Sequence, residues 1–223
     1  GDLDSVTIGA ASVLSGPIGV EAGQQAVCYS ASEGKCVGVY KQSADNDCFA
    51  VVITPNGSDR SVAYGTPAEF EPTAGENVTV TDIGSSKVLI CYGDDSNSGY
   101  PTSRVGTISG TDITFGDKDV IQSVQSSIGG FQASGKNRNL TWDSNTSRAV
   151  FMWRQNTTNK LMCAVGSNSG TDMTWGTPVE VHAPGLDGDK WNADATASLD
   201  PTVNGADQTY QHTTGDSAVC MFS

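Results

Sequence analysis

Few residues of this chain have the types and spacing that catalysis requires. A nucleophilic triad needs a general base, and the only two histidines, His182 and His212, lie in polar segments typical of solvated side chains. No GxSxG elbow, HExxH pair or phosphate-binding glycine loop occurs. A glycoside hydrolase needs two carboxylates that face each other across a cleft, and no pair stands out among 25 acidic residues. The sequence therefore predicts no catalytic residue and a protein that is not an enzyme.

A sialidase-like enzyme would in addition gather arginines around the carboxylate of its substrate. The arginines of this chain share no repeated position that would bring them together: Arg60, Arg104, Arg138, Arg148 and Arg154. Hydrolase activity is accordingly the weakest of the functional alternatives.

Cysteines and acidic turns are the candidates for metal chemistry. The six cysteines have no CxxC spacing, so with two histidines they predict no zinc site. Buried free thiols and one to three disulfides both fit an even number of cysteines in an extracellular chain. The acidic turns at 94–97 and 187–189 offer oxygen ligands for calcium, but they lack EF-hand spacing. Aspartate and asparagine also occur in turns to satisfy local backbone groups, so we predict no metal site and keep calcium as an alternative.

Aromatic residues could form sugar-stacking sites. Tyr40, Tyr92, Trp153 and Phe222 occupy one repeated position, and Tyr64, Phe115 and Trp175 occupy another. We predict that both sets pack between sheets. Trp142 and Trp191 lie outside these positions and are the candidate ligand-binding residues.

The chain contains five Asn-X-Ser/Thr sequons, which are candidate glycosylation sites in a secreted protein. They are Asn56, Asn77, Asn139, Asn145 and Asn156. Three of them, Asn56, Asn145 and Asn156, fall in predicted turns, where a glycan could be accommodated.

A repeated unit of about fifty residues must position all of these side chains. Its clearest copy covers residues 139–181 and consists of four short runs of β-forming residues separated by Asn, Ser, Gly and Asp. The segment SGTDITFG, which ends at Gly116, nearly matches SGTDMTWG, which ends at Gly176. The second strand of each copy is predicted to begin at Lys35, Lys87, Arg148 and Ser217. The first strands, at Cys28, Val80, Thr141 and Tyr210, precede these positions by seven residues.

The repeats predict an all-β fold. The second strands, such as AVFMW and VLICY, are continuously apolar, which indicates sheets that are covered on both faces. The fourth copy ends after its second strand, and the missing part resembles residues 2–15, as a closed ring requires. We predict a single-domain four-bladed β-propeller whose last blade is closed by the N-terminal strand, with a β-sandwich as the alternative. The blades are expected at about 24–72, 76–123, 137–183, and 206–223 plus 2–15, with an insertion over one face at 183–207.

Charge and hydrophobicity narrow the functional classes. The net charge is −13, and twelve scattered Lys and Arg residues form no basic patch, so nucleic acid and anionic membranes are not expected partners. No apolar run has the length of a membrane span, so membrane insertion is not expected either. The sequence begins at Gly1 and shows no signal peptide. We expect an extracellular, virion or cell-surface location. The negative net charge is expected to keep the protein soluble there.

Two resemblances follow from the repeat. The hairpin that ends at Thr174-Trp175 resembles the Asp-box hairpins of sialidase-like propellers. The whole unit resembles the repeats of about fifty residues in structural and adhesin proteins of marine viruses and microbes, through Asp143-Ser-Asn145 and the segment VGTISGTDITFG that ends at Gly116. The second resemblance implies an architecture and a surface context, not a reaction.

We therefore expect a non-catalytic, extracellular structural or adhesive module. It would be a glycoprotein that associates with itself or contacts glycans or proteins of a surface. A lectin-like, carbohydrate-binding protein is the alternative. The N-terminal strand is expected to close either its own ring or that of a neighbouring molecule.

Overall fold

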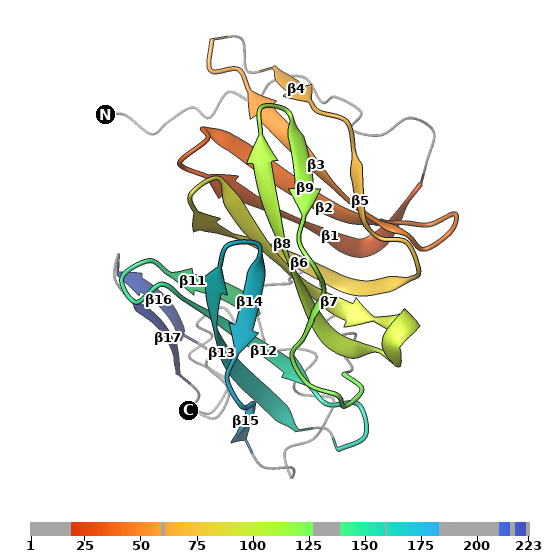
Figure 1. The fold of residues 1–223 in the computed structure, drawn as a ribbon, viewed down its shortest axis with the longest axis vertical. Helices are drawn as coiled ribbons and strands as arrows, with labels where there is room; N and C mark the ends of the chain where they lie inside the picture. Colours follow the sequence, from red (N-terminus) through yellow and green to blue (C-terminus); the bar gives the residue numbers. More distant parts are fainter. Residues whose placement is uncertain are drawn as a thin grey trace, which may run out of the picture.

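The structure, a computed structural model, describes residues 19–58, 61–126, 139–158, 160–182, 210–214 and 217–221. These residues form antiparallel strands, one 3-10 turn and connecting loops, so the predicted all-β fold is confirmed (Figure 1). In the described ranges, no helix is long and apolar enough to cross a membrane. The predicted closing segment 2–15 and the predicted insertion 183–207 lie outside these ranges.

Three sheets share one topology, which we number I to III. In each, the first three strands form a meander, and the third strand pairs with a fourth strand at one end and a fifth at the other. Sheet I comprises β1 (Val20–Ser30), β2 (Lys35–Gln42), β3 (Cys48–Pro55), β4 (Val62–Tyr64) and β5 (Ala68–Glu71). Sheet II comprises β6 (Gly75–Gly84), β7 (Lys87–Asp94), β8 (Tyr100–Ser109), β9 (Asp112–Phe115) and β10 (Asp119–Val120), with a 3-10 turn η1 (Asp95–Asn97).

Sheet III repeats the pattern, and a hairpin follows it. Its strands are β11 (Leu140–Asp143), β12 (Arg148–Arg154), β13 (Leu161–Ser169), β14 (Asp172–Trp175) and β15 (Val179–His182). The hairpin, which we call hairpin IV, consists of β16 (Tyr210–Thr214) and β17 (Ser217–Met221). It falls where the repeats predict the first two strands of a fourth copy.

The second strands begin where the repeats predict. The strands β2, β7, β12 and β17 start at Lys35, Lys87, Arg148 and Ser217. The prediction that equivalent positions of the first strands lie seven residues before the start of every second strand is wrong, because the turns between the two strands differ in length. The last pair is Ser30 with Lys35 in sheet I but Thr214 with Ser217 in hairpin IV.

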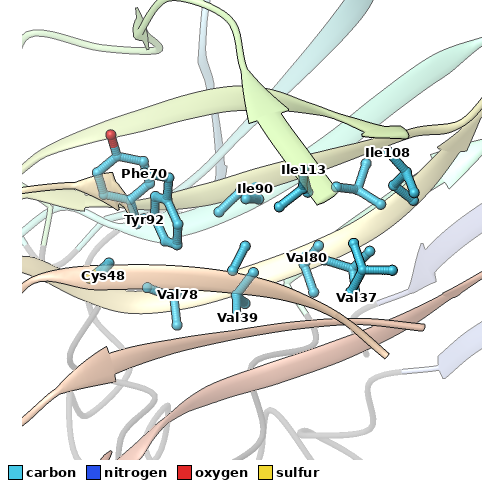
Figure 2. Close-up of a cluster of buried hydrophobic side chains, with 13 residues drawn as sticks. Val37, Val39, Cys48, Phe70, Val78, Val80, Ile90, Tyr92, Ile108 and Ile113 are labelled. Carbon is cyan, nitrogen blue, oxygen red and sulfur yellow. The ribbon is translucent and has the colours of Figure 1, made fainter. Parts of the chain in front are cut away.

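The sheets stack in chain order. The strand β6 lies against β1, β11 lies against β6, and β17 lies beside β11. One apolar core fills the space between sheets I and II, and a second core fills the space between sheets II and III. Figure 2 shows side chains of sheets I and II, among them Phe70, Tyr92 and Val39, pointing toward one another in the first core.

The strand β7 illustrates the predicted burial on both faces. Val88, Ile90 and Tyr92 belong to the core shared with sheet I, and Leu89 and Cys91 belong to the core shared with sheet III. All five side chains are fully buried. Burial of each such aliphatic side chain contributes about 1.5–3 kcal/mol, so the middle sheet is held from both sides. In a two-layer β-sandwich each sheet has one uncovered face. Sheet II is covered on both faces, so it does not have the arrangement of the predicted alternative, a β-sandwich.

Candidate functional site

The buried ionisable groups of the described residues are concentrated between sheets I and II. Glu71 at the end of β5 is fully buried, and Asp94 at the end of β7 is nearly so. The Lys118 Nζ atom lies 2.5 Å from Glu71 Oε2 and 3.0 Å from Asp94 Oδ2. We call these three residues the Lys118 triad. Since two carboxylates would otherwise repel each other in a space of low polarity, the lysine supplies the compensating charge.

Neighbouring donors fix the buried carboxylate of the triad. The Tyr92 hydroxyl donates to Glu71 Oε2 at 2.9 Å, and the Thr73 backbone N–H and hydroxyl donate to Glu71 Oε1 at 3.2 and 2.9 Å. Both oxygens of Glu71 are therefore occupied, which makes this carboxylate a fixed structural charge rather than a general base.

The pKa shifts of Lys118 and Tyr92 are those expected for a structural ion pair. Burial alone would lower the pKa of Lys118, but its hydrogen bonds to Glu71 and Asp94 and their negative charges raise it overall. Burial and the charge of Glu71 raise the pKa of Tyr92 far above its ordinary value. At neutral pH the lysine is thus charged and the tyrosine is neutral.

A second lysine bridges two carboxylates at the start of β6. The Lys41 side chain is only 4% exposed, and its Nζ atom lies 2.9 Å from Glu21 Oε2 and 2.5 Å from Glu76 Oε1. The buried Gln24 side chain donates to Glu76 Oε2 at 2.9 Å and accepts a hydrogen bond from the Asn77 backbone N–H at 2.5 Å. Hydrogen bonds to Glu76 and Glu21 outweigh the effect of burial, which acts in the opposite direction, and raise the pKa of Lys41. This cluster also connects sheet I to sheet II.

Sheets II and III are joined by hydrogen bonds of polar side chains that involve no lysine. Gln155 directly follows β12, at the position equivalent to Asp94 at the end of β7. Its Nε2 atom donates to Gln122 Oε1 at 3.0 Å. The Met173 backbone N–H donates to Asp119 Oδ2 at 2.8 Å, and Trp175 Nε1 donates to Ser103 Oγ at 2.8 Å. The buried polar groups at both interfaces therefore join one sheet to the next.

A glycine makes a close backbone contact at each interface. The Gly65, Gly116 and Gly176 N–H groups donate to the Val52, Val105 and Val165 carbonyls, so the three glycines are structurally equivalent. A Cβ atom at Gly65 would lie 1.8 Å from the Thr111 carbonyl oxygen of sheet II. A Cβ atom at Gly116 would lie 2.1 Å from the Thr171 carbonyl oxygen of sheet III. The aromatic-glycine pair at the end of each hairpin is thus a contact point between sheets.

Four of the repeated aromatic residues pack between sheets, as predicted: Tyr92, Phe115, Trp153 and Trp175. Tyr40 instead stacks on Phe49 of its own sheet. Phe70 of sheet I contacts Tyr92 and Phe115 of sheet II, with ring centroids 5.4 and 5.8 Å apart. Trp153 is fully buried in the core between sheets II and III, with Trp175 packed against that core. Phe222 lies outside the described residues.

The two candidate ligand-binding tryptophans do not form a common site in the described structure. Trp142 on β11 is partly buried and packs against the core between sheets II and III. Trp191 lies outside the described ranges. The structure thus assigns Trp142 a packing contact.

The five sequons differ in accessibility. Asn56, Asn145 and Asn156 lie in exposed turns. Asn77 is only 2% exposed, and the Asn139 Nδ2 atom donates to the Met152 carbonyl at 3.0 Å. The fold therefore leaves room for a glycan at three positions and engages or buries the other two.

We predict the same selectivity in a eukaryotic secretory host. Asn56, Asn145 and Asn156 are expected to carry glycans in the folded secreted protein, whereas Asn77 and Asn139 are expected to be bare, because a glycan on either would displace a packed side chain. Enzymatic deglycosylation in heavy-oxygen water followed by peptide mass spectrometry measures each site. High occupancy at Asn77 in folded protein would contradict this assignment.

Four described cysteines are free thiols, as the first of the two alternatives predicts for them: Cys28, Cys36, Cys48 and Cys91. Burial raises the pKa of Cys28 and of Cys48 to about 12 and raises the pKa of Cys91 well above its usual value. These three thiols are protonated at neutral pH and act as apolar packing groups.

The remaining candidate groups have local roles. Arg104 donates to the carbonyls of Phe70 and Gly116, so it too bridges sheets I and II. Asp94, in the acidic turn considered for calcium, is engaged by Lys118. Within the described part of the chain, no group of three or more His, Cys, Asp or Glu residues could hold a metal ion. The second acidic turn, 187–189, lies outside that part.

Sequence reasoning missed the two lysine-centred clusters. The signal available was an acidic residue directly after a buried apolar strand, as in AEFE ending at Glu71 and CYGD ending at Asp94. Such a residue requires a charge partner. The partner is Lys118, which lies in a loop 24 residues after Asp94, so local sequence does not identify it.

Comparisons of the chain with protein-family models, with curated proteins and with solved structures found no match.

Proposed function

We propose that the chain is a non-catalytic, extracellular structural or adhesive module built as a closed four-bladed β-propeller. The observation that carries this proposal is the use of the buried polar side chains. The Lys118 triad, the Lys41 cluster and the pair of Gln122 and Gln155 each join one sheet to its neighbour. These charged and polar side chains therefore stabilise the contacts between repeated sheets. Such a role fits a structural protein that presents a rigid surface.

Unequal burial of equivalent residues supports the closed ring on the side of sheet III. Val52, Val105 and Val165 accept the same hydrogen bond from the repeated glycines. Val52 and Val105 are fully buried because sheets II and III cover them, whereas Val165 is 48% exposed. An apolar residue at this position calls for a further sheet, and β17 already lies beside β11 of sheet III.

Equivalent residues are also unequally buried at the other end of the stack, on the side of sheet I. Val27, Val80 and Leu140 pair with the fourth residue of β2, β7 and β12. Val80 and Leu140 are each 8% exposed because a preceding sheet covers them, whereas Val27 is 64% exposed. A fourth sheet between sheets III and I would cover both open faces and close the ring.

Gly176 tests the closed ring. Among the described residues, its Cβ position meets only the Val165 carbonyl oxygen at 3.4 Å, a contact within its own sheet. If a fourth sheet contacts Gly176 as sheet III contacts Gly116, the Gly176→Ala variant will lose several degrees of thermal stability. An unchanged melting temperature would contradict ring closure.

The functional class is tested on the intact protein. Sedimentation velocity over a wide concentration range measures self-association, and a glycan array with and without calcium measures attachment to surface sugars. We expect concentration-dependent association or selective glycan retention without turnover. Hydrolysis of glycoside or sialoside substrates would overturn the proposal.

A further inference from the structure

We propose that Asn56 is a self-modification site, at which the protein deamidates its own side chain when no glycan is attached. The Gly57 backbone nitrogen attacks the Asn56 side-chain amide, ammonia is released, and the residue becomes aspartate or isoaspartate. An Asn-Gly pair offers this attack the least steric obstruction, because glycine has no Cβ atom. The chain contains two such pairs, and the structure describes the first of them. The inference concerns the tip of the β3–β4 hairpin and does not depend on the proposed function.

This hairpin tip differs from the equivalent tips of sheets II and III. The last strand pair leaves six residues, 56–61, in the loop of sheet I. It leaves only two residues, 110–111 and 170–171, in the loops of sheets II and III. The two short tips lie against the repeated glycines of the preceding sheets, whereas residues 56–58 of the long tip are exposed. The long tip is therefore accessible to water and to modifying enzymes.

Hydrogen bonds within the tip hold the Asn56 side chain beside the next peptide group. The Ser58 backbone N–H donates to Asn56 Oδ1 at 3.1 Å, and the Ser58 hydroxyl donates to the same oxygen at 2.8 Å. The first of these bonds closes a small ring of atoms that contains both Asn56 Cγ and the Gly57 nitrogen. The atom that is attacked and the atom that attacks are thus held within one turn, which lowers the entropic cost of their reaction.

The same two hydrogen bonds assist the attack electrostatically. Bond formation at Asn56 Cγ moves negative charge onto Oδ1, and the two donors of Ser58 already point at that oxygen. No atom of the described residues lies within 4 Å of the Gly57 Cβ position, so the surroundings of the attacking nitrogen are open.

The reaction requires only water. The Gly57 nitrogen gives its proton to solvent base and forms a bond to Asn56 Cγ, while the bond from Cγ to Nδ2 breaks and Nδ2 leaves as ammonia. Water then opens the cyclic imide at either of its carbonyls, which yields aspartate or isoaspartate. Each conversion adds one negative charge to the net charge of −13, and isoaspartate also lengthens the main chain of the tip.

Glycosylation and deamidation compete for the same amide nitrogen. Asn56 is the acceptor of the sequon Asn56-Gly57-Ser58. A glycan on Nδ2 makes the departing nitrogen part of a bulky sugar amine and shields the exposed tip. The two modifications of Asn56 therefore exclude each other, and only unglycosylated molecules are expected to convert.

The test uses the full chain made in bacteria, without glycans, and incubated at about pH 7 and about pH 8. Peptide mass spectrometry measures conversion at each asparagine, and an isoaspartyl methyltransferase assay measures isoaspartate. Conversion at Asn56 should be at least about tenfold faster than at Asn156, an exposed sequon that is followed by the branched residue Thr157. The rate at Asn56 should rise about tenfold from pH 7 to pH 8, because the attacking nitrogen must lose its proton.

Gly57→Val is the decisive variant, because it hinders the attacking nitrogen but keeps the sequon. The backbone of Gly57 is not left-handed and its Cβ position is open, so valine should be accommodated. The variant should slow conversion at Asn56 about tenfold or more, and Gly57→Ala should slow it to a smaller degree.

Equal rates in the wild type and Gly57→Val, or conversion at Asn56 no faster than at Asn156, would overturn the inference. Glycosylated protein from a eukaryotic secretory host should keep Asn56 unconverted under the same conditions. Conversion there as fast as in the bare protein would show that the two modifications do not exclude each other.

Discussion

Replacement of Lys118 by methionine is expected to destabilise the fold by about 3 kcal/mol. The substitution leaves Glu71 and Asp94 buried together without their shared cation, and removal of one member of a buried ion pair typically costs about 3–5 kcal/mol. The lower end of that range applies because the Lys118 side chain is 32% exposed and solvent screens part of the interaction. Urea unfolding followed by fluorescence and circular dichroism measures the change.

Lys160 provides the matched control for this prediction. Its Nζ atom lies 2.7 Å from Glu180 Oε2, but both side chains are about one-third exposed. Lys160→Met should therefore change the free energy of unfolding by less than about 1 kcal/mol. In the Lys118→Met background, Glu71→Gln with Asp94→Gln should recover most of the loss, since that pair reproduces Gln122 and Gln155. Equal effects of Lys118→Met and Lys160→Met would contradict a buried triad.

The pH dependence of the same triad has a defined sign. The folded state raises the pKa of Lys118 above 10.5, so the folded protein holds this proton more tightly than the unfolded chain. The resulting stabilisation is fully present below the unfolded pKa and is lost as pH rises through the folded pKa. The wild type should thus lose more stability than Lys118→Met above about pH 10.5. Parallel losses in denaturant titrations from pH 8 to 12 would count against this linkage.

The repeated hairpins could be predicted because their signals are local. Apolar runs, turn residues and the copied SGTD segment predicted the first residues of β2, β7, β12 and β17 correctly. The lengths of the first turns could not be predicted, because hairpins with different turn lengths can bury the same apolar face. The sequence showed that β7 is covered on both faces but not which residues cover it.

The polar clusters depend on contacts between distant segments. Lys41 and Glu76 are 35 residues apart and belong to different sheets. No local pattern distinguishes these residues from solvated ones, and a single sequence contains many equally spaced acids and lysines. Burial likewise separates Asn77 from Asn56 although their sequons look alike. Such distinctions require knowledge of which sheet lies against which.

Substitution of Gly116 by alanine is the second change with a large expected effect. A Cβ atom would lie 2.1 Å from the Thr171 carbonyl oxygen and 2.8 Å from Thr171 Cβ, far inside van der Waals contact. The obstacle is the backbone of sheet III, which is held by its own strand pairing, so the sheets must move apart. Overpacking of this kind costs about 1–3 kcal/mol, and the backbone contact places Gly116→Ala at the upper end.

Gly57 is the control for an effect of alanine itself. No atom of the described residues lies within 4 Å of its Cβ position, so Gly57→Ala should leave stability unchanged within about 0.5 kcal/mol. Gly65→Ala should resemble Gly116→Ala, because its Cβ would lie 1.8 Å from the Thr111 carbonyl. Since the two glycines separate different pairs of sheets, their effects should add in the double variant. A neutral Gly116→Ala in urea unfolding would mean that sheets II and III are not in the contact described.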